Sequence, residues 1–149
     1  MTIKQQLYDA CRESLHKREQ AIRSALDAAQ AAANEETKSS AGDKHETGRA
    51  MMQLETEKLG VQLQEVRLEQ EKLQRIRADR RCQTVEPGAL VITDKLRLYF
   101  AISAGKIILE SGEYFALSTQ TPLGKAALGL QKNNTFALQN QEYQIKEII

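Results

Sequence analysis

The stretch "SSAGDKHETGRA", residues 39–50, separates two long charged segments in which apolar residues recur at helical spacing. It contains two glycines and several small polar residues, which interrupt helices and favour turns. We therefore predict that the chain reverses direction here. The segments on either side are predicted to form two antiparallel helices joined by this turn.

Each flanking segment carries an apolar stripe with spacings of three, four or seven residues. The stripe before the turn consists of Leu7, Cys11, Leu15, Ile22, Leu26 and Ala29. The stripe after it consists of Met52, Leu59, Leu63, Val66 and Leu73. Two facing stripes of this kind predict an α-helical coiled-coil hairpin over residues 1–83. A second apolar row after the turn lies outside this stripe and could face another protomer or the C-terminal region. It consists of Met51, Leu54, Val61, Leu68 and Ile76.

The composition changes near "RRCQTVEPGA", residues 80–89. Of the first 80 residues 28 are charged, against 13 of the last 69, and both prolines lie in the later part. We therefore place a domain boundary here and predict a second, β-rich domain over residues 84–149, so that the chain is α+β. Leu96, Leu98, Phe100 and Ile102 alternate with more polar positions, as in a half-buried strand.

Further strands are predicted between short turns in the C-terminal region. They cover residues 89–93, 107–109, 114–117, 135–138 and 143–149. One short helix interrupts them in "TPLGKAALG", residues 121–129, where Thr121 is expected as the N-cap and Pro122 as the first helical residue. Gly129 falls where a C-terminal glycine is expected.

Several classes of function are disfavoured by the composition. No apolar run is long enough for a signal peptide or a membrane span, so we expect a cytoplasmic protein without a membrane partner. Cys11 and Cys82 are expected to be reduced thiols. With His16 and His45 as the only histidines, neither a Cys/His catalytic arrangement nor metal-ligand spacing is visible, so we do not expect an autonomous enzyme.

Two carboxylates follow the predicted turn. Asp43 as N-cap and Glu46 three residues later fit a capping box, which stabilises a helix start by about 1 kcal/mol. Residues three apart also share one helix face, and magnesium prefers carboxylate oxygens. Asp43 and Glu46 are too few to hold an ion tightly alone, but they could complete a site that another macromolecule half provides.

At these residues the chain resembles the Gre transcript-cleavage factors of bacterial RNA polymerase, GreA and GreB. Their coiled-coil tip carries Gly-Asp-x-x-Glu-Asn, and "GDKHET" matches it at Gly42, Asp43 and Glu46. Their FKBP-like C-terminal domain contains a stretch similar to "TPLGKAALG" and a final strand similar to "YQIKEI". The resemblance covers nearly the whole chain.

This resemblance implies a monomeric accessory factor with an FKBP-like domain over residues 84–149. That domain would dock on bacterial RNA polymerase through Thr121, Pro122, Leu123 and Lys125, with Pro122 and Leu123 as an exposed anchor. The hairpin would enter the secondary channel, where Asp43 and Glu46 would hold magnesium jointly with the polymerase and assist cleavage of backtracked nascent RNA. No cofactor would be tightly bound in isolation.

Other hypotheses remain open. Thr47-Gly48-Arg49-Ala50 replaces the family's usual Asn-Ala-Glu-Tyr, which favours a secondary-channel regulator that does not promote cleavage. A coiled-coil adaptor without polymerase contact is a third hypothesis. The basic residues Lys72, Arg75, Arg77, Arg80 and Arg81 could contact RNA or polymerase, although a solvated helix face interleaved with acids is favoured.

Overall fold

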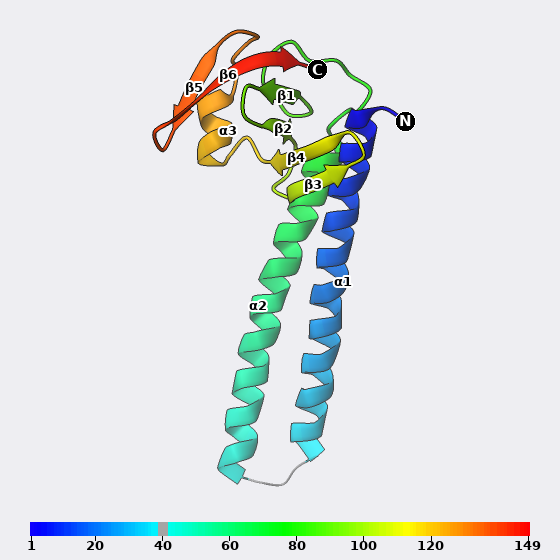
Figure 1. Ribbon diagram of the computed structural model, residues 1–149. Helices are drawn as coiled ribbons and strands as arrows, with labels where there is room; N and C mark the ends of the chain where they lie inside the picture. Colours follow the sequence, from blue (N-terminus) through cyan, green and yellow to red (C-terminus); the bar gives the residue numbers. More distant parts are fainter. Residues whose placement is uncertain (39–41) are drawn as a thin grey trace. The chain divides into compact units, whose positions relative to one another are not determined.

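The computed structural model describes the backbone of residues 1–38 and 42–149 and the side chains of residues 1–35 and 47–149. The chain is α+β, with two long helices followed by a six-stranded mixed sheet (Figure 1). It divides into two compact units. The helical unit is Leu15–Glu69, and the sheet unit combines Met1–Ser14 with Gln70–Ile149. The boundary expected between residues 83 and 84 stays a prediction.

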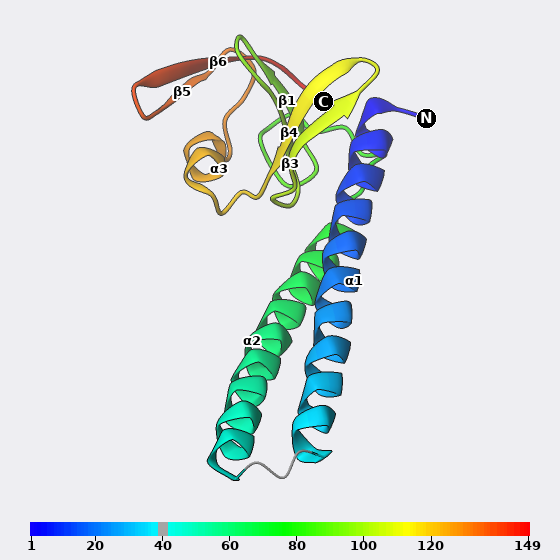
Figure 2. The same ribbon diagram turned by 60° about the horizontal axis from the view of Figure 1, so that its bottom comes forward.

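The two helices are α1, Ile3–Lys38, and α2, Gly42–Gln74. In the helical unit they run side by side in opposite directions (Figures 1 and 2). The buried side chains of this unit, Leu15, Ala29, Leu59 and Val66, all belong to the two predicted stripes. None of the described helices combines the length and the apolar character that a membrane crossing needs.

The second apolar row divides between the units. Met51, Leu54, Val61 and Leu68 are 46% to 67% exposed, whereas Ile76 is buried in the sheet unit. The row is therefore an exposed face of α2 over most of its length, and only its last member joins a core.

The sheet contains β1 (Leu90–Thr93), β2 (Arg97–Phe100), β3 (Gly105–Leu109), β4 (Gly112–Leu117), β5 (Thr135–Leu138) and β6 (Gln141–Ile148). Its strand order is β3-β4-β2-β1-β6-β5. Among the described strands, only β2 and β4 pair in parallel, because the β3-β4 hairpin returns the chain beside β2. The short helix α3, Pro122–Ala127, connects β4 to β5. All six strands lie where the sequence predicts them, with ends shifted by a few residues.

One face of this sheet forms the main hydrophobic core. The cluster on that face consists of Cys82, Val85, Ala89, Val91, Leu98, Phe100, Leu117, Ala127, Phe136, Ile145 and Ile148. Ala127 brings α3 onto the cluster, and Leu123 and Leu130 pack at its margin. The alternating residues Leu98 and Phe100 therefore point inward, as predicted for β2.

The opposite face of β2 is also covered, which the sequence pattern did not predict. Tyr99 is fully buried, although its position in the alternation indicated an exposed side chain. It lies close to Tyr8 and Cys11 of α1. Because the first turns of α1 belong to the sheet unit, β2 is buried on both faces and the prediction of a half-buried strand was wrong.

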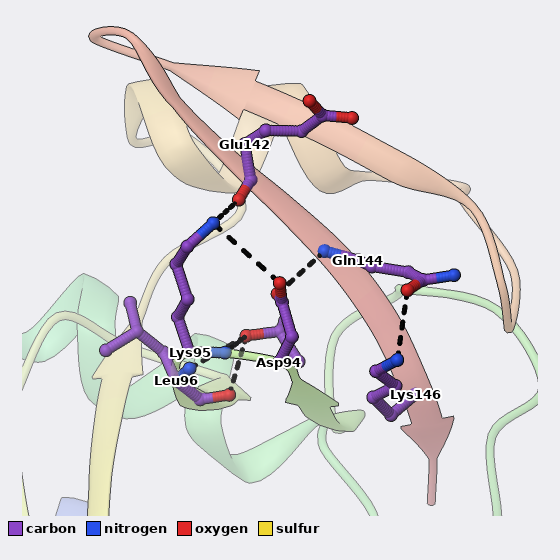
Figure 3. A network of polar contacts seen from close by, with 7 residues as sticks. Asp94, Lys95, Leu96, Glu142, Gln144 and Lys146 are labelled. Carbon is purple, nitrogen blue, oxygen red and sulfur yellow. Dashed lines mark hydrogen bonds and ion pairs between the residues drawn. The ribbon is translucent and has the colours of Figure 1, made fainter.

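The turn between β1 and β2 is fixed to β6 by a polar network (Figure 3). The Asp94 carboxylate accepts a hydrogen bond from the main-chain N–H of Gln144 at 2.9 Å, which lowers the pKa of Asp94. Lys95 donates to the main-chain oxygen of Glu142 and pairs with Asp94 at 3.8 Å. These contacts attach the predicted Asp94-Lys95 turn to the neighbouring strand β6, so this charged cluster has a structural role.

Candidate functional site

The residues predicted to form the acidic tip lie at the beginning of α2. The helix starts at Gly42, so Asp43 is its second residue and lies inside the first turn, not at the N-cap. The backbone of Glu46 follows three residues later in the same helix. The side chains of Asp43 and Glu46 lie outside the described residues. Acidic residues in a first turn interact favourably with the positive end of the helix dipole.

The residues after this pair are described. Thr47 and Arg49 are exposed, and Gly48 is half-buried within α2. Arg49 lines a surface cavity together with residues that include Gln30 and Met52. Among the residues with described side chains, no group of three or more histidine, cysteine, aspartate or glutamate residues could hold a metal ion.

Helix α3 begins as predicted. Thr121 is its N-cap and accepts a hydrogen bond from the Gly124 N–H at 3.0 Å, with Pro122 in the first turn. The Thr121 hydroxyl also donates to the main-chain oxygen of Ser118 at 2.9 Å. Gly129, two residues beyond the helix, has a φ of +82°, the left-handed conformation that favours glycine. The predicted cap and helix are confirmed.

The exposed apolar residue of this region is not the predicted one. Leu123 is half-buried and packs against the hydrophobic core, so it is not available as an exposed anchor. Pro122 and Lys125 are exposed, and Leu128, just after α3, is 48% exposed. Leu128 was missed because a leucine late in a short helical pattern is expected to face the core. If this surface docks on a partner, Leu128 is the better apolar anchor.

The basic run does not form a single helix face. Because α2 ends at Gln74, Lys72 lies on the helix whereas Arg75, Arg77 and Arg80 follow it in the connection to the sheet. Arg77 pairs with Asp79 at 3.3 Å and Arg80 with Glu86 at 3.1 Å. Within the part of the chain that the structure describes, the Arg75 side chain makes no ion pair. The same four basic residues line one cavity of the sheet unit.

A buried lysine next to this connection was also missed. Lys4 is only 5% exposed, and its ammonium donates to the main-chain oxygens of Arg80 at 2.6 Å and Ile149 at 3.0 Å. Burial lowers the pKa of Lys4, and the nearby Cys82 and Glu86 oppose that shift. Lysine is rarely buried in proteins, so the residue type gave no indication that Lys4 would be buried. Its contacts fix the beginning of α1 to residues far away in the sequence.

The two thiols are not suited to nucleophilic chemistry. Both cysteines are free and buried. Burial raises the pKa of Cys11 to about 12 and also raises the pKa of Cys82. A thiol must ionise to act as a nucleophile, so neither residue is activated.

The described residues thus include a cavity lined by basic side chains. They also include the capped helix α3, beside which Pro122, Lys125 and Leu128 are exposed. The two acidic residues lie at the start of α2. No protein-family model matches this chain, and none of the curated proteins does.

Proposed function

We propose that this chain is a Gre-like accessory factor of bacterial RNA polymerase. In this proposal the helical unit is an antiparallel coiled-coil hairpin that enters the secondary channel. It stimulates the polymerase to cleave backtracked RNA in a magnesium-dependent reaction. The nuclease centre belongs to the polymerase, so the factor itself is not an enzyme, and it acts in the cytoplasm as a monomer.

The observation that carries this proposal is the position of the two acidic residues. Asp43 and Glu46 lie in the first five residues of α2, at the end of a 33-residue helix that is roughly 50 Å long. Residues three apart lie on one face of a helix. A pair of carboxylates at the end of a long helix can therefore be carried to a site on a larger partner.

The residues fit the expected ion in their chemistry. Magnesium is commonly bound by one or two carboxylates, with water or phosphate oxygens in the remaining positions. Asp43 and Glu46 would supply the two carboxylates, and the polymerase with its RNA would supply the rest. When bound, the ion would stabilise negative charge on the reacting oxygens. The role of this chain is to bring two negative charges to that place and hold them there.

The sheet unit supports a docking role in the same proposal. We propose that residues 84–149 have an FKBP-like fold, consistent with a mixed sheet and one short helix ahead of the last two strands. The surface around α3 offers Pro122, Lys125 and Leu128 for contact with polymerase, while Thr121 acts through capping. An apolar side chain on a well-fixed element is a suitable interface anchor.

A transcript-cleavage assay on a stalled, backtracked elongation complex tests the catalytic role. Asp43→Asn and Glu46→Gln remove the charge and keep the shape, so we expect each to reduce RNA shortening sharply while polymerase binding persists. Additional magnesium should restore part of the activity, because the defect would lie in ion occupancy. Glu65→Gln, an exposed glutamate on the same helix, is the matched control and should leave cleavage unchanged. Full activity in the Asp43→Asn, Glu46→Gln double variant would refute the catalytic role.

Docking requires a separate measurement of polymerase affinity. Leu128→Asp is expected to weaken binding, whereas Ile108→Asp, on the exposed edge strand β3, should not. Leu123→Asp is less informative, because this side chain packs against the core and its loss would also affect folding. Equal affinities of the Leu128→Asp and Ile108→Asp variants would remove α3 from the interface.

A second candidate function is a regulator that occupies the channel without promoting cleavage. Thr47 and Arg49 are exposed directly after the acidic pair, so a positive charge lies three residues from Glu46. It would oppose cation binding. This function predicts no shortened RNA in the cleavage assay, together with slowed initiation in a separate promoter-dependent transcription assay.

The third candidate, an adaptor without polymerase contact, is favoured by the exposed row on α2. Met51, Leu54, Val61 and Leu68 would suit a helical partner. Absence of the chain from RNA polymerase purified from the cells that make it would select this function over the other two.

A further inference from the structure

The connection between α2 and the sheet borders a cavity of about 480 Å³. This volume is within the range of small-molecule binding sites, roughly 300 to 1,000 Å³. All of its lining belongs to the sheet unit. The cavity is therefore formed within one compact part of the chain.

The lining is strongly positive. It includes Lys72, Arg75, Arg77 and Arg80 but only one carboxylate, that of Glu86. Four cations and one anion give it a formal charge of +3, in a chain whose net charge is +1. Charge concentrated at a concave surface attracts anions more strongly than the same charge spread over the molecule.

The three arginines of the lining can contact a ligand without breaking a strong buried pair. Arg75 makes no ion pair with any described residue. Arg77 pairs with the exposed Asp79, and Arg80 pairs with the half-buried Glu86. An exposed pair such as Arg77–Asp79 contributes at most about 1 kcal/mol. A phosphate group, which arginine binds through two parallel hydrogen bonds, would replace such a partner favourably.

The rest of the lining is not charged. Ser118, Thr119 and Gln120 provide hydroxyl and amide groups on the loop before α3. This loop is fixed by the hydrogen bond from the Gln120 N–H to the Ser118 hydroxyl at 3.1 Å and by the Thr121 cap. Apolar surface comes from Ile76, Cys82, Pro87 and Ala101. A ligand that fits this lining combines adjacent negative charges with a largely apolar body.

We propose that this cavity binds a nucleoside di- or triphosphate. The phosphates contact the arginines, with Arg75 as the principal contact. The base contacts the apolar residues of the lining, and the loop before α3 donates and accepts hydrogen bonds. This site is distinct from the acidic tip and does not depend on the proposed action on RNA polymerase.

Isothermal titration calorimetry of the full chain tests the site, with GTP and ATP as probes in magnesium-free buffer. We expect saturable binding of one nucleotide with a dissociation constant below about 1 mM. Arg75→Gln should weaken binding about tenfold or more, because it removes a charge-assisted contact. Arg67→Gln, an exposed arginine of α2 outside the cavity, is the matched control and should change binding less than about twofold.

Three further probes separate the proposal from general attraction of anions. Adenosine should bind far more weakly than ATP, and inorganic pyrophosphate should bind more weakly than either nucleotide. Nucleotide binding that falls equally in the Arg67→Gln and Arg75→Gln variants would overturn the proposal. The proposal would also be overturned if pyrophosphate bound as tightly as ATP. The same holds if a short single-stranded RNA bound when neither nucleotide did. Circular dichroism should show the same folded content in both variants, since both side chains are exposed.

Discussion

Replacing Gly124 with alanine should destabilise the sheet unit, although alanine is the better helix former. Gly124 is buried in α3, where a Cβ atom would overlap the main-chain oxygen of Ser118 and lie 2.8 Å from the Cα atom of Thr119. These are main-chain atoms in a loop that the Thr121 cap fixes, so they cannot move aside easily. The close approach explains why a glycine occupies the centre of "TPLGKAALG".

The size of the effect follows from two opposing contributions. Alanine in place of glycine favours a helix by about 1 kcal/mol. Overpacking costs about 1 to 3 kcal/mol, and a contact with fixed main-chain atoms falls at the upper end. We therefore expect Gly124→Ala to lower the free energy of unfolding by about 2 kcal/mol. Gly60→Ala is the matched control, because Gly60 is an exposed residue inside α2 with nothing within 4 Å of its Cβ position. It should raise stability by about 1 kcal/mol.

Urea denaturation followed by circular dichroism measures both variants against the parent chain. The expected result is a pair of shifts in opposite directions from the same chemical change. If Gly124→Ala were as stable as the parent or more so, the close packing of α3 on the loop before it would be refuted. A loss of stability in Gly60→Ala would instead show that helix propensity is outweighed at that position.

Three further predictions concern buried polar groups of the sheet unit. The Tyr99 hydroxyl is buried and has no hydrogen-bond partner among the described residues, so Tyr99→Phe should raise stability by about 1 kcal/mol in urea denaturation, and a clear loss would indicate a hidden partner. Lys4→Met should cost about 2 kcal/mol in the same assay, because it removes the donor to Arg80 and Ile149, and an unchanged midpoint would contradict this. The folded-state pKa of Cys11 is raised from 9.0 to about 12, so the folded chain keeps a proton that the unfolded chain loses, and stability should fall from pH 9 toward pH 12. That decline should be smaller in Cys11→Ala, and identical pH profiles would exclude Cys11 as a cause.

The sequence predicted what depends on local interactions. The turn at Asp94-Lys95, the Thr121 cap and the strand positions follow from residues within a few places of each other, and the structure confirms them. The apolar stripes correctly identified the buried faces of the long helices, because helical spacing is itself a local property.

What the sequence did not predict depends on contacts between distant segments. Alternation in β2 indicates which side chains share a face, but not that the start of α1 covers the second face and buries Tyr99. Likewise, nothing near Lys4 indicates that main-chain oxygens more than 70 residues away surround its ammonium. The basic residues were recognised, but the cavity requires Ser118 and Gln120, which lie far from them in the sequence.

The acidic pair illustrates a different case. Its recognition rests on residue type and spacing, and the backbone adds only that both residues lie in the first turns of α2. The function proposed for that position depends on charge presented to a partner. Such a role needs no packing or hydrogen bonding within the chain, so the transcript-cleavage assay tests it directly.

The discontinuous sheet unit has a consequence for biosynthesis. Residues 1–14 join residues 70–149, so 55 residues of the helical unit emerge from the ribosome between the two parts. The hydrogen bond from Lys4 to Ile149 links positions 145 residues apart. Helices close local contacts quickly, whereas long-range contacts must first overcome the entropy of a large loop. The nascent chain should therefore form the helices early and complete the sheet unit only after its last strand has left the exit tunnel, with the apolar residues Leu7 and Cys11 exposed to chaperones until then.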